Sequence, residues 1–326
     1  MTALVIAGVE VVAGLALLML GGELLLRGGV ALAKRLGIQP LLIGLTVVAC
    51  ATSMPELMVT LTAGFQGVPD IGVGNIVGSN IANILLILGA AALVYPITAP
   101  RGLVRRDGMV MLGATALFTL MAWFTPAMTW MHGTLFLVLL VGYLWWSYTL
   151  ECHKTVPDPG AETTEAMEQA PDSIWIAVLL VIGGVIGLFV GSELLIEGAI
   201  FLARRGGVSD AVIGLTLVAI GTSLPELAAS VVAAMKRHSD IAIGNVIGSN
   251  IFNLLGIFGV LAVVHDFTVS IEILRVDVWI LLAATLLLLF ILAAGRRIGR
   301  GIGLLFLALY AGFIVIQIDS IKVLLL

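Results

Sequence analysis

Long apolar segments alternate with short polar ones along almost the whole chain. A bilayer core requires about 20 apolar residues per helix, and ten segments come near that length. They lie at residues 4–26, 41–65, 71–95, 109–125, 131–150, 175–198, 211–235, 240–264, 277–294 and 303–320. The pattern therefore predicts an all-α polytopic membrane protein with ten transmembrane helices.

The one longer polar stretch, residues 151–172, is acidic, contains proline and lacks apolar periodicity. We interpret it as a linker between a first five-helix half, 1–150, and a second, 173–326. Five spans is an odd number, so the second half should enter the membrane inverted. Most Lys and Arg residues fall on the side opposite the N-terminus, which the positive-inside rule makes cytoplasmic. We expect a cell (inner) membrane protein with both termini outside and the linker in the cytoplasm.

The two halves also contain the same sequence. Residues 43–89 align without a gap to residues 213–259 at an offset of 170, with 24 of 47 positions identical. The polar and helix-breaking residues are the ones that repeat, which a duplication kept only for packing does not explain well. Matching interrupted segments in two halves indicate the binding site of a secondary transporter, built as an inverted repeat.

Each copy contains Thr-Ser-x-Pro-Glu, at residues 52–56 and 222–226. Proline removes a backbone donor and clashes with the carbonyl group four residues earlier, so each helix should distort here. We expect the nearby carbonyl groups of Ala49 and Ala219 to turn toward a cavity. Irregular backbone at this depth is tolerated only where it is buried in protein or lines a polar cavity.

A glutamate follows each proline directly. A carboxylate in the middle of a membrane is a functional hypothesis by default, and Glu56 and Glu226 are related by the repeat. If they meet at the centre, they form a site with a charge of about −2. Hydroxyl groups should wall this site, from Thr52, Ser53, Thr222 and Ser223.

The second part of each repeat reads Gly-Asn-x-x-Gly-Ser-Asn-Ile-x-Asn. Its GxxxG spacing lets two helices approach closely. Ser79 and Asn83 are four residues apart, so they share one helix face, as do Ser249 and Asn253, and we expect both pairs to face the cavity. For the other asparagines the pattern favours interhelical hydrogen bonds; they are Asn75, Asn80, Asn245 and Asn250.

The expected ligand atoms are all oxygen, which suits hard cations such as Ca²⁺ and also Na⁺. Thiolates and imidazoles are missing from the motifs, which argues against Zn²⁺ or Cu⁺. Protons compete, because burial favours the protonated form of a carboxyl group. Outside the motifs, Glu23 lies four residues before Arg27 and should form a local ion pair, whereas Asp70 and Asp240 should cap helices.

Composition narrows the function class. The chain is 60% hydrophobic and 11% charged, whereas soluble domains carry roughly 25% charged residues. There is no basic stripe for nucleic acid, and none of the HExxH, GxSxG or P-loop motifs of enzymes. We expect no enzymatic activity and no cofactor, with small cations and membrane lipid as partners of a protein that functions as a monomer. A passive cation channel is the other membrane-protein class considered, and the inverted repeat argues against it because a channel does not need one.

On these motifs the chain resembles the cation/calcium exchanger superfamily, in its prokaryotic sodium/calcium antiporter form. The resemblance covers essentially the whole chain and rests on GTSLPEL, here also ATSMPEL, and on both copies of GNxxGSNIxN. It implies exchange of several Na⁺ for one Ca²⁺ by alternating access around a central cluster of ion sites. A Ca²⁺/H⁺ antiporter with Glu56 and Glu226 as proton carriers is the alternative.

The resemblance also implies a set of ion ligands, with Glu56 and Glu226 binding Ca²⁺ directly. The implied ligands are the carbonyl groups of Ala49 and Ala219 and the side chains of Thr52, Ser53, Glu56, Ser79, Asn83, Thr222, Ser223, Glu226, Ser249 and Asn253. Some family members carry Asp at the position of Asn253, so the stoichiometry and any use of K⁺ stay open. The chain also lacks the large cytosolic regulatory loop of animal exchangers.

Overall fold

The computed structural model describes residues 2–38, 40–152, 173–206, 221–295 and 297–324. The helices of the first half are α1 (Thr2–Leu36), α2 (Pro40–Ile43), α3 (Ala49–Thr52), α4 (Met54–Phe65), α5 (Pro69–Ala82), α6 (Leu88–Val94), α7 (Arg101–Leu103), α8 (Met109–Phe124) and α9 (Trp130–Cys152). Those of the second half are α11 (Ile174–Arg205), α14 (Leu224–Met235), α15 (Ser239–Ile251), α16 (Phe258–Val264), α17 (Val278–Ala293) and α18 (Arg300–Leu324).

Wider π-helical turns join several of these helices into continuous rods. They are η1 (Gly44–Val48), η2 (Asn83–Ile87), η3 (Val104–Gly108), η5 (Phe252–Ile257) and η6 (Ile273–Asp277). Two short strands, β1 (Ala127–Met128) and β2 (Phe267–Thr268), pair antiparallel with Ala127 opposite Thr268. This small ribbon, which the all-α expectation did not include, ties the α8–α9 turn to the segment after α16.

Within the described residues, eight helices are long and apolar enough to cross a membrane, and the bent pair 41–52 and 54–65 makes a ninth. These nine match nine of the ten expected spans in order. The remaining one, 211–235, is described only in its second part, as the apolar helix α14, because residues 207–220 lie outside the described residues. Most of the expected linker, residues 153–172, also lies outside them. The molecule is thus a helical, multi-span protein.

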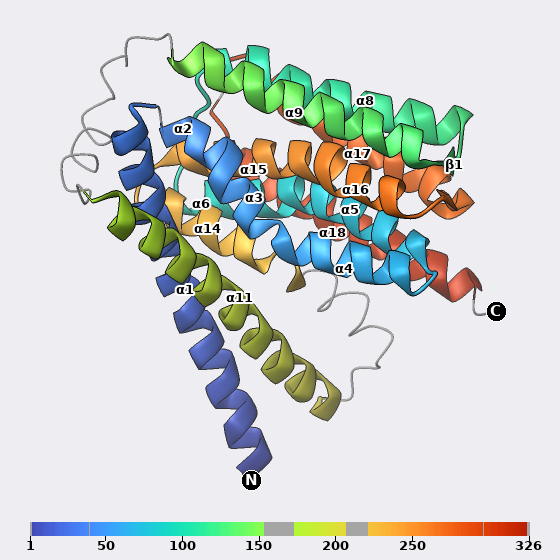
Figure 1. Cartoon of the computed structure of the whole chain (residues 1–326). Helices are drawn as coiled ribbons and strands as arrows, with labels where there is room; N and C mark the ends of the chain where they lie inside the picture. Colours follow the sequence, from blue (N-terminus) through green and yellow to red (C-terminus); the bar gives the residue numbers. More distant parts are fainter. Residues whose placement is uncertain (1, 39, 153–172, 207–220, 296, 325–326) are drawn as a thin grey trace.

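The first helix is much longer than expected. We predicted a span at 4–26, but α1 has 35 residues, which is about 52 Å at 1.5 Å per residue. Lys34 and Arg35, expected in a loop, form its last turn, where cations stabilise the carboxyl end of a helix. α11 likewise ends with two arginines. Figure 1 shows α1 and α11 side by side, running obliquely to the other helices.

Glycines let α1 and α11 pack backbone against backbone. A Cβ atom added at Gly184 would lie 2.5 Å from the Leu25 amide nitrogen, and one added at Gly21 would lie 2.6 Å from that of Leu188. Real Cβ atoms do not approach so closely, so only glycine fits at these crossings. The two oblique helices therefore form one tightly packed pair.

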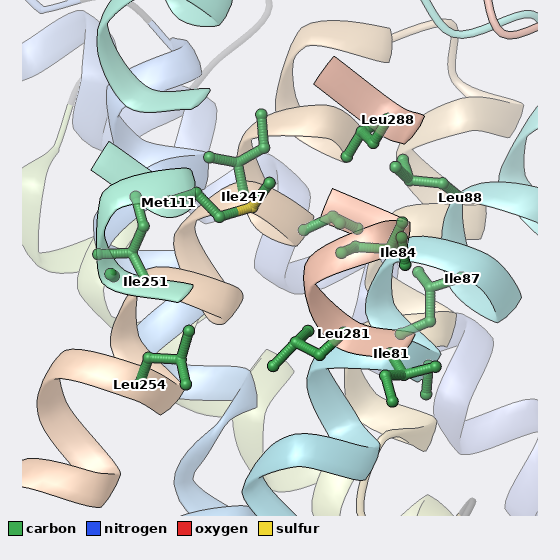
Figure 2. Close-up of a cluster of buried hydrophobic side chains, with 14 of the residues drawn as sticks. Ile81, Ile84, Ile87, Leu88, Met111, Ile247, Ile251, Leu254, Leu281 and Leu288 are labelled. Atoms are coloured by element: carbon green, nitrogen blue, oxygen red, sulfur yellow. The ribbon is translucent and has the colours of Figure 1, made fainter. Parts of the chain in front are cut away.

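The remaining helices enclose a large buried core. Leu88, Met111, Ile247 of α15 and Leu288 of α17 all belong to this core (Figure 2). Phe258 is at the centre of an aromatic cluster, with its ring 4.9 Å from that of Phe118 in an edge-to-face arrangement. Residues of α5 and α15, the helices that carry the repeated Ser and Asn residues, are part of this core.

The fourth span also begins earlier than predicted. We expected 109–125, but the helix runs without a break from α7 through η3 into α8. Arg105, Arg106 and Asp107 are therefore helical and do not lie in a loop. Apolar residues alone did not indicate this start, because the first turns carry charges.

The acids outside the motifs behave differently from one another. Glu23 forms the expected ion pair with Arg27, with 2.7 Å between Oε1 and Nε, and its second oxygen lies 3.1 Å from Lys236 at the end of α14. The expectation that Asp70 and Asp240 cap helices is wrong. The N-cap residues are Val68 and His238, because Pro69 and Ser239 already occupy the first helical position. Asp70 instead accepts a hydrogen bond from the Ser270 amide.

Candidate ion-binding site

The site lies where two helices are interrupted in the middle of the molecule. The second span bends by 43° between Thr52 and Met54, and the intervening Ser53 has φ −83° and ψ 9°. Ser223 precedes α14 with nearly the same backbone angles, φ −89° and ψ 6°. The proline that follows each serine occupies the first turn of the next helix. The distortion predicted from these prolines is confirmed for 52–56.

Two reciprocal hydrogen bonds connect the halves across this centre. Ser53 Oγ donates to Glu226 Oε1 at 2.9 Å, and Ser223 Oγ donates to Glu56 Oε1 at 3.1 Å. Both glutamates are only 1% exposed. The two carboxyl groups, 170 residues apart in sequence, therefore belong to one buried cluster, as the repeat predicted.

The second motif contributes from α5 and α15. Ser79 and Asn83 are buried, and Ser79 Oγ lies 3.3 Å from Ser223 Oγ. Their counterparts Ser249 and Asn253 are buried too. The helix widens to a π-helical turn at Asn83, in η2, and around Asn253, in η5. Such turns are rare and frequently mark functional sites.

Several buried polar atoms of this cluster make no hydrogen bond within the described residues. One oxygen of each glutamate is among them, Glu56 Oε2 and Glu226 Oε2, with both amide atoms of Asn83 and Asn253 and the Ser249 hydroxyl. A buried polar atom without a partner costs about 1–3 kcal/mol, so these atoms have capacity for a ligand. They offer carboxylate, amide and hydroxyl oxygens, the donors that hard cations such as Ca²⁺ take.

The described residues contain no group of three or more His, Cys, Asp and Glu side chains that could hold a metal ion. Among the described residues, the cluster offers a cation two carboxylates, from Glu56 and Glu226, together with neutral oxygens.

The threonine side chains and carbonyl groups predicted as ligands do not all lie in this cluster of unbonded oxygens. Thr52 is buried, and its hydroxyl donates to the Val48 carbonyl at 3.0 Å within its own helix. The Ala49 carbonyl accepts the Ser53 amide at 3.1 Å, so this helical hydrogen bond is intact. A carbonyl oxygen has two lone pairs, so this bond does not prevent it from also binding an ion. Thr222 is half-buried, and Ala219 lies outside the described residues.

Two asparagines form hydrogen bonds with residues in and next to the cluster. Asn75 Nδ2 donates to the Glu56 carbonyl oxygen at 3.3 Å, and its Oδ1 accepts from Thr222 Oγ1 at 3.4 Å. The interhelical bonds expected for Asn75 are thereby confirmed, and Asn245 Nδ2 likewise donates to Ser230 Oγ at 3.0 Å.

The same expectation is wrong for the other two asparagines. Asn80 and Asn250 are fully buried, yet neither amide has a hydrogen-bond partner in the described part of the chain. Sequence reasoning also did not include Thr60 and Ser230, which bond to Asn75 and Asn245. Both lie one helical turn after the glutamate of their motif, and that spacing could have indicated them.

Sequence reasoning missed a further buried acid outside this cluster. Asp107 is fully buried, and its Oδ1 accepts hydrogen bonds from Arg106 Nε and Tyr143 Oη, each at 2.9 Å. The bond to Tyr143 joins the start of the fourth span to α9. Asp277 lies 170 residues after Asp107, and its Oδ1 likewise accepts a hydrogen bond, from Gln317 Nε2.

Comparison with known proteins agrees with this architecture. The chain is 38% identical to CaxA of Alkalimonas amylolytica over 95% of its length and 98% of the relative's. It is 31% identical to the sodium/calcium exchanger MaX1 of Methanosarcina acetivorans, with 93% and 96% coverage. Its identity to the inner membrane protein YrbG of Escherichia coli is 33%, covering 96% of each chain.

Solved structures agree as well. A structure of the sodium-calcium exchanger NCX_Mj aligns with a TM-score of 0.81 and 32% identity over 96% of this chain and 98% of that one. The profile of the family described as sodium/calcium exchanger protein matches twice, at residues 7–149 and 176–318. These matches cover most of the sequence in both halves. The chain belongs to the sodium/calcium exchanger protein family, a family of multi-pass membrane transporters.

Proposed function

We propose that this protein is an antiporter that exchanges Na⁺ for Ca²⁺ across the membrane and has no enzymatic activity. The observation that carries the proposal is the pair of reciprocal bonds from Ser53 to Glu226 and from Ser223 to Glu56. Within the described part of the chain, each glutamate also keeps one buried oxygen without a partner, which leaves both carboxylates able to bind an ion between them. The relatives MaX1 and NCX_Mj, both described as sodium/calcium exchangers, support the choice of ions.

In this proposal the two glutamates bind Ca²⁺ directly. Their two negative charges match the charge of the ion, and one Ca²⁺ requires six to eight oxygen ligands. Amide and hydroxyl oxygens fill the remaining positions and also bind Na⁺, which needs fewer charges. They come from Thr52, Ser53, Ser79, Asn83, Thr222, Ser223, Ser249 and Asn253, with the carbonyl groups of Ala49 and Ala219.

Transport then follows from the relation between the halves. We propose two inverted five-helix repeats, 1–150 and 173–326, joined by a cytoplasmic linker at 151–172. The bonds from Ser53 to Glu226 and from Ser223 to Glu56 each join one half to the other. A movement of one half relative to the other would therefore rearrange the site and open it to one side of the membrane or the other in turn. The matches of the family profile in each half support this reading. A single copy of the chain contains all proposed ligands, so the monomer should suffice.

The orientation is also part of the proposal. We propose that the linker is cytoplasmic and that both termini lie outside, because Lys and Arg are in excess on one side of the expected topology. The relative YrbG, described as an inner membrane protein, supports the same membrane for this chain.

Uptake of radioactive Ca²⁺ into proteoliposomes tests the function. Vesicles loaded with Na⁺ and diluted into Na⁺-free buffer should accumulate Ca²⁺, and the ionophore monensin, which collapses the Na⁺ gradient, should abolish uptake. Vesicles with only an outward H⁺ gradient serve as the comparison. Uptake driven by H⁺ and indifferent to Na⁺ would refute Na⁺ coupling and make Glu56 and Glu226 the proton carriers. Protein-free vesicles control for leakage.

A further inference from the structure

The oblique helices α1 and α11 contact the rest of the molecule unequally. At the offset of 170, α1 corresponds to α11 and α4 corresponds to α14, so a symmetric molecule would have matching contacts between α1 and α14 and between α11 and α4. α1 packs closely on α14, because a Cβ atom added at Gly22 would lie 2.9 Å from Val232 Cγ2 and 3.3 Å from the Ala228 carbonyl oxygen. Val232 and Ala229 are accordingly only 2% and 7% exposed.

The matching face of α4 is open. Val59 and Thr62 lie 170 residues before Ala229 and Val232, and both are exposed. A cavity of about 190 Å³ lies between α11 and the start of α4, and its wall includes Thr52 of the first motif. Thus α1 covers its face of α14, whereas α11 leaves the equivalent face of α4 uncovered.

An ion pair joins α1 to the end of α14. Glu23 Oε2 lies 3.1 Å from Lys236 Nζ, and Glu23 Oε1 lies 2.7 Å from Arg27 Nε. The other half repeats the acid as Glu193, but Gln66 stands at the position equivalent to Lys236. A neutral amide forms no ion pair with a carboxylate, so a contact between α11 and the end of α4 would lack this interaction.

We propose that Glu23 and Lys236 form a latch that favours the state closed at the Lys236 end, which the proposed orientation makes cytoplasmic. This inference rests on the proposed antiport, in which inverted halves exchange roles between two states. In the second state α11 covers α4 and α1 leaves α14, so the ion pair breaks and no counterpart replaces it. A partly exposed ion pair shifts an equilibrium by about two- to five-fold, so the ion site opens to the outside more often than in a symmetric chain.

Modification of single cysteines measures the two states in the full-length protein. Val232→Cys should react only while α1 has left α14, whereas Thr62→Cys is accessible while α4 is uncovered. Each is introduced after Cys50 and Cys152 have been replaced by alanine, and its rate of reaction with N-ethylmaleimide is measured in detergent. We expect Val232→Cys to react more slowly than Thr62→Cys, and equal rates would contradict the assigned closed contact.

Variants of the latch test its role. Lys236→Gln should raise the reaction rate of Val232→Cys about two- to five-fold, whereas Lys236→Arg keeps the charge and should leave that rate unchanged. Gln66→Lys supplies the missing partner of Glu193, so it should speed the reaction of Val232→Cys and slow that of Thr62→Cys. An unchanged rate in Lys236→Gln, or an equal rise in Lys236→Arg, would refute the latch.

These outcomes are distinct from those that test the proposed function. The reaction rates require no ion gradient, so a failure of Na⁺-driven Ca²⁺ uptake would refute the exchange and leave the shift between the two contacts measurable. Lys236 lies outside the ion site, so Lys236→Gln should bind Ca²⁺ as the parent does. Elution profile and thermal unfolding verify that each variant folds.

Discussion

Replacing either central glutamate by glutamine tests the ion site most directly. Glu56→Gln and Glu226→Gln keep the size of the side chain and remove one of two negative charges. Both side chains are 1% exposed, so the lost charge lies in a buried site and not in solvent. Each variant also weakens the hydrogen bond from the serine of the opposite half, because an amide oxygen is a poorer acceptor than a carboxylate.

The size of the effect follows from burial. Removing one member of a buried, hydrogen-bonded charge pair costs about 2–5 kcal/mol. At 1.36 kcal/mol per factor of ten, this corresponds to a loss of about 30- to 5,000-fold in Ca²⁺ affinity. The two glutamates occupy equivalent positions, so both variants should lose a similar amount. At micromolar Ca²⁺, uptake by either variant should be undetectable.

The assay is equilibrium binding of radioactive Ca²⁺ to purified protein, followed by uptake into proteoliposomes. Glu23→Gln is the matched control, because Glu23 is also an acid of the helix bundle but binds Arg27 and Lys236. It should keep Ca²⁺ affinity close to that of the parent. If Glu56→Gln or Glu226→Gln binds Ca²⁺ within about three-fold of the parent, less than 1 kcal/mol, the charge of that residue does not bind the ion and the site is wrong.

Three further predictions concern stability and coupling. Gly184→Val should lower the free energy of unfolding by about 1–3 kcal/mol, because its side chain meets the α1 backbone. Gly183→Val is the control and should have a small effect, because an added Cβ there meets only a side-chain atom at 3.9 Å. Equal melting temperatures of the two variants would contradict this prediction. Tyr143→Phe should lose about 1–3 kcal/mol by withdrawing a donor from Asp107, and Tyr310→Phe should lose less in the same unfolding assay. If more than two Na⁺ exchange for each Ca²⁺, an imposed membrane potential alone should drive Ca²⁺ movement; indifference to voltage would indicate neutral exchange.

The centre of the molecule could be foreseen because its chemistry is local. A proline followed by a glutamate inside an apolar segment forces both a break and a buried charge, and Ser53 lies at that break. The repeat then related Glu56 to Glu226 without any structural knowledge. The sequence did not indicate which serine bonds to which glutamate, because that pairing depends on how the two halves face each other.

The failures have physical causes too. The extent of α1 was underestimated because hydropathy reports where a helix leaves the membrane and not where its backbone hydrogen bonds end. Asp107 was missed because its partner Tyr143 is 36 residues away, on the next span. Asn80 and Asn250 are the same residue type in the same motif as Asn75 and Asn245, which bond across helices, and only packing distinguishes the two pairs.

The crossed serine–glutamate bonds also bear on how such a duplicated chain can change over time. A substitution of Ser53 alters the surroundings of Glu226, and one of Ser223 alters those of Glu56. Neither half can therefore specialise for one ion without changing the acid of the other. A change at either serine therefore acts in both halves at once, so the two copies of the motif can change their ion preference only together.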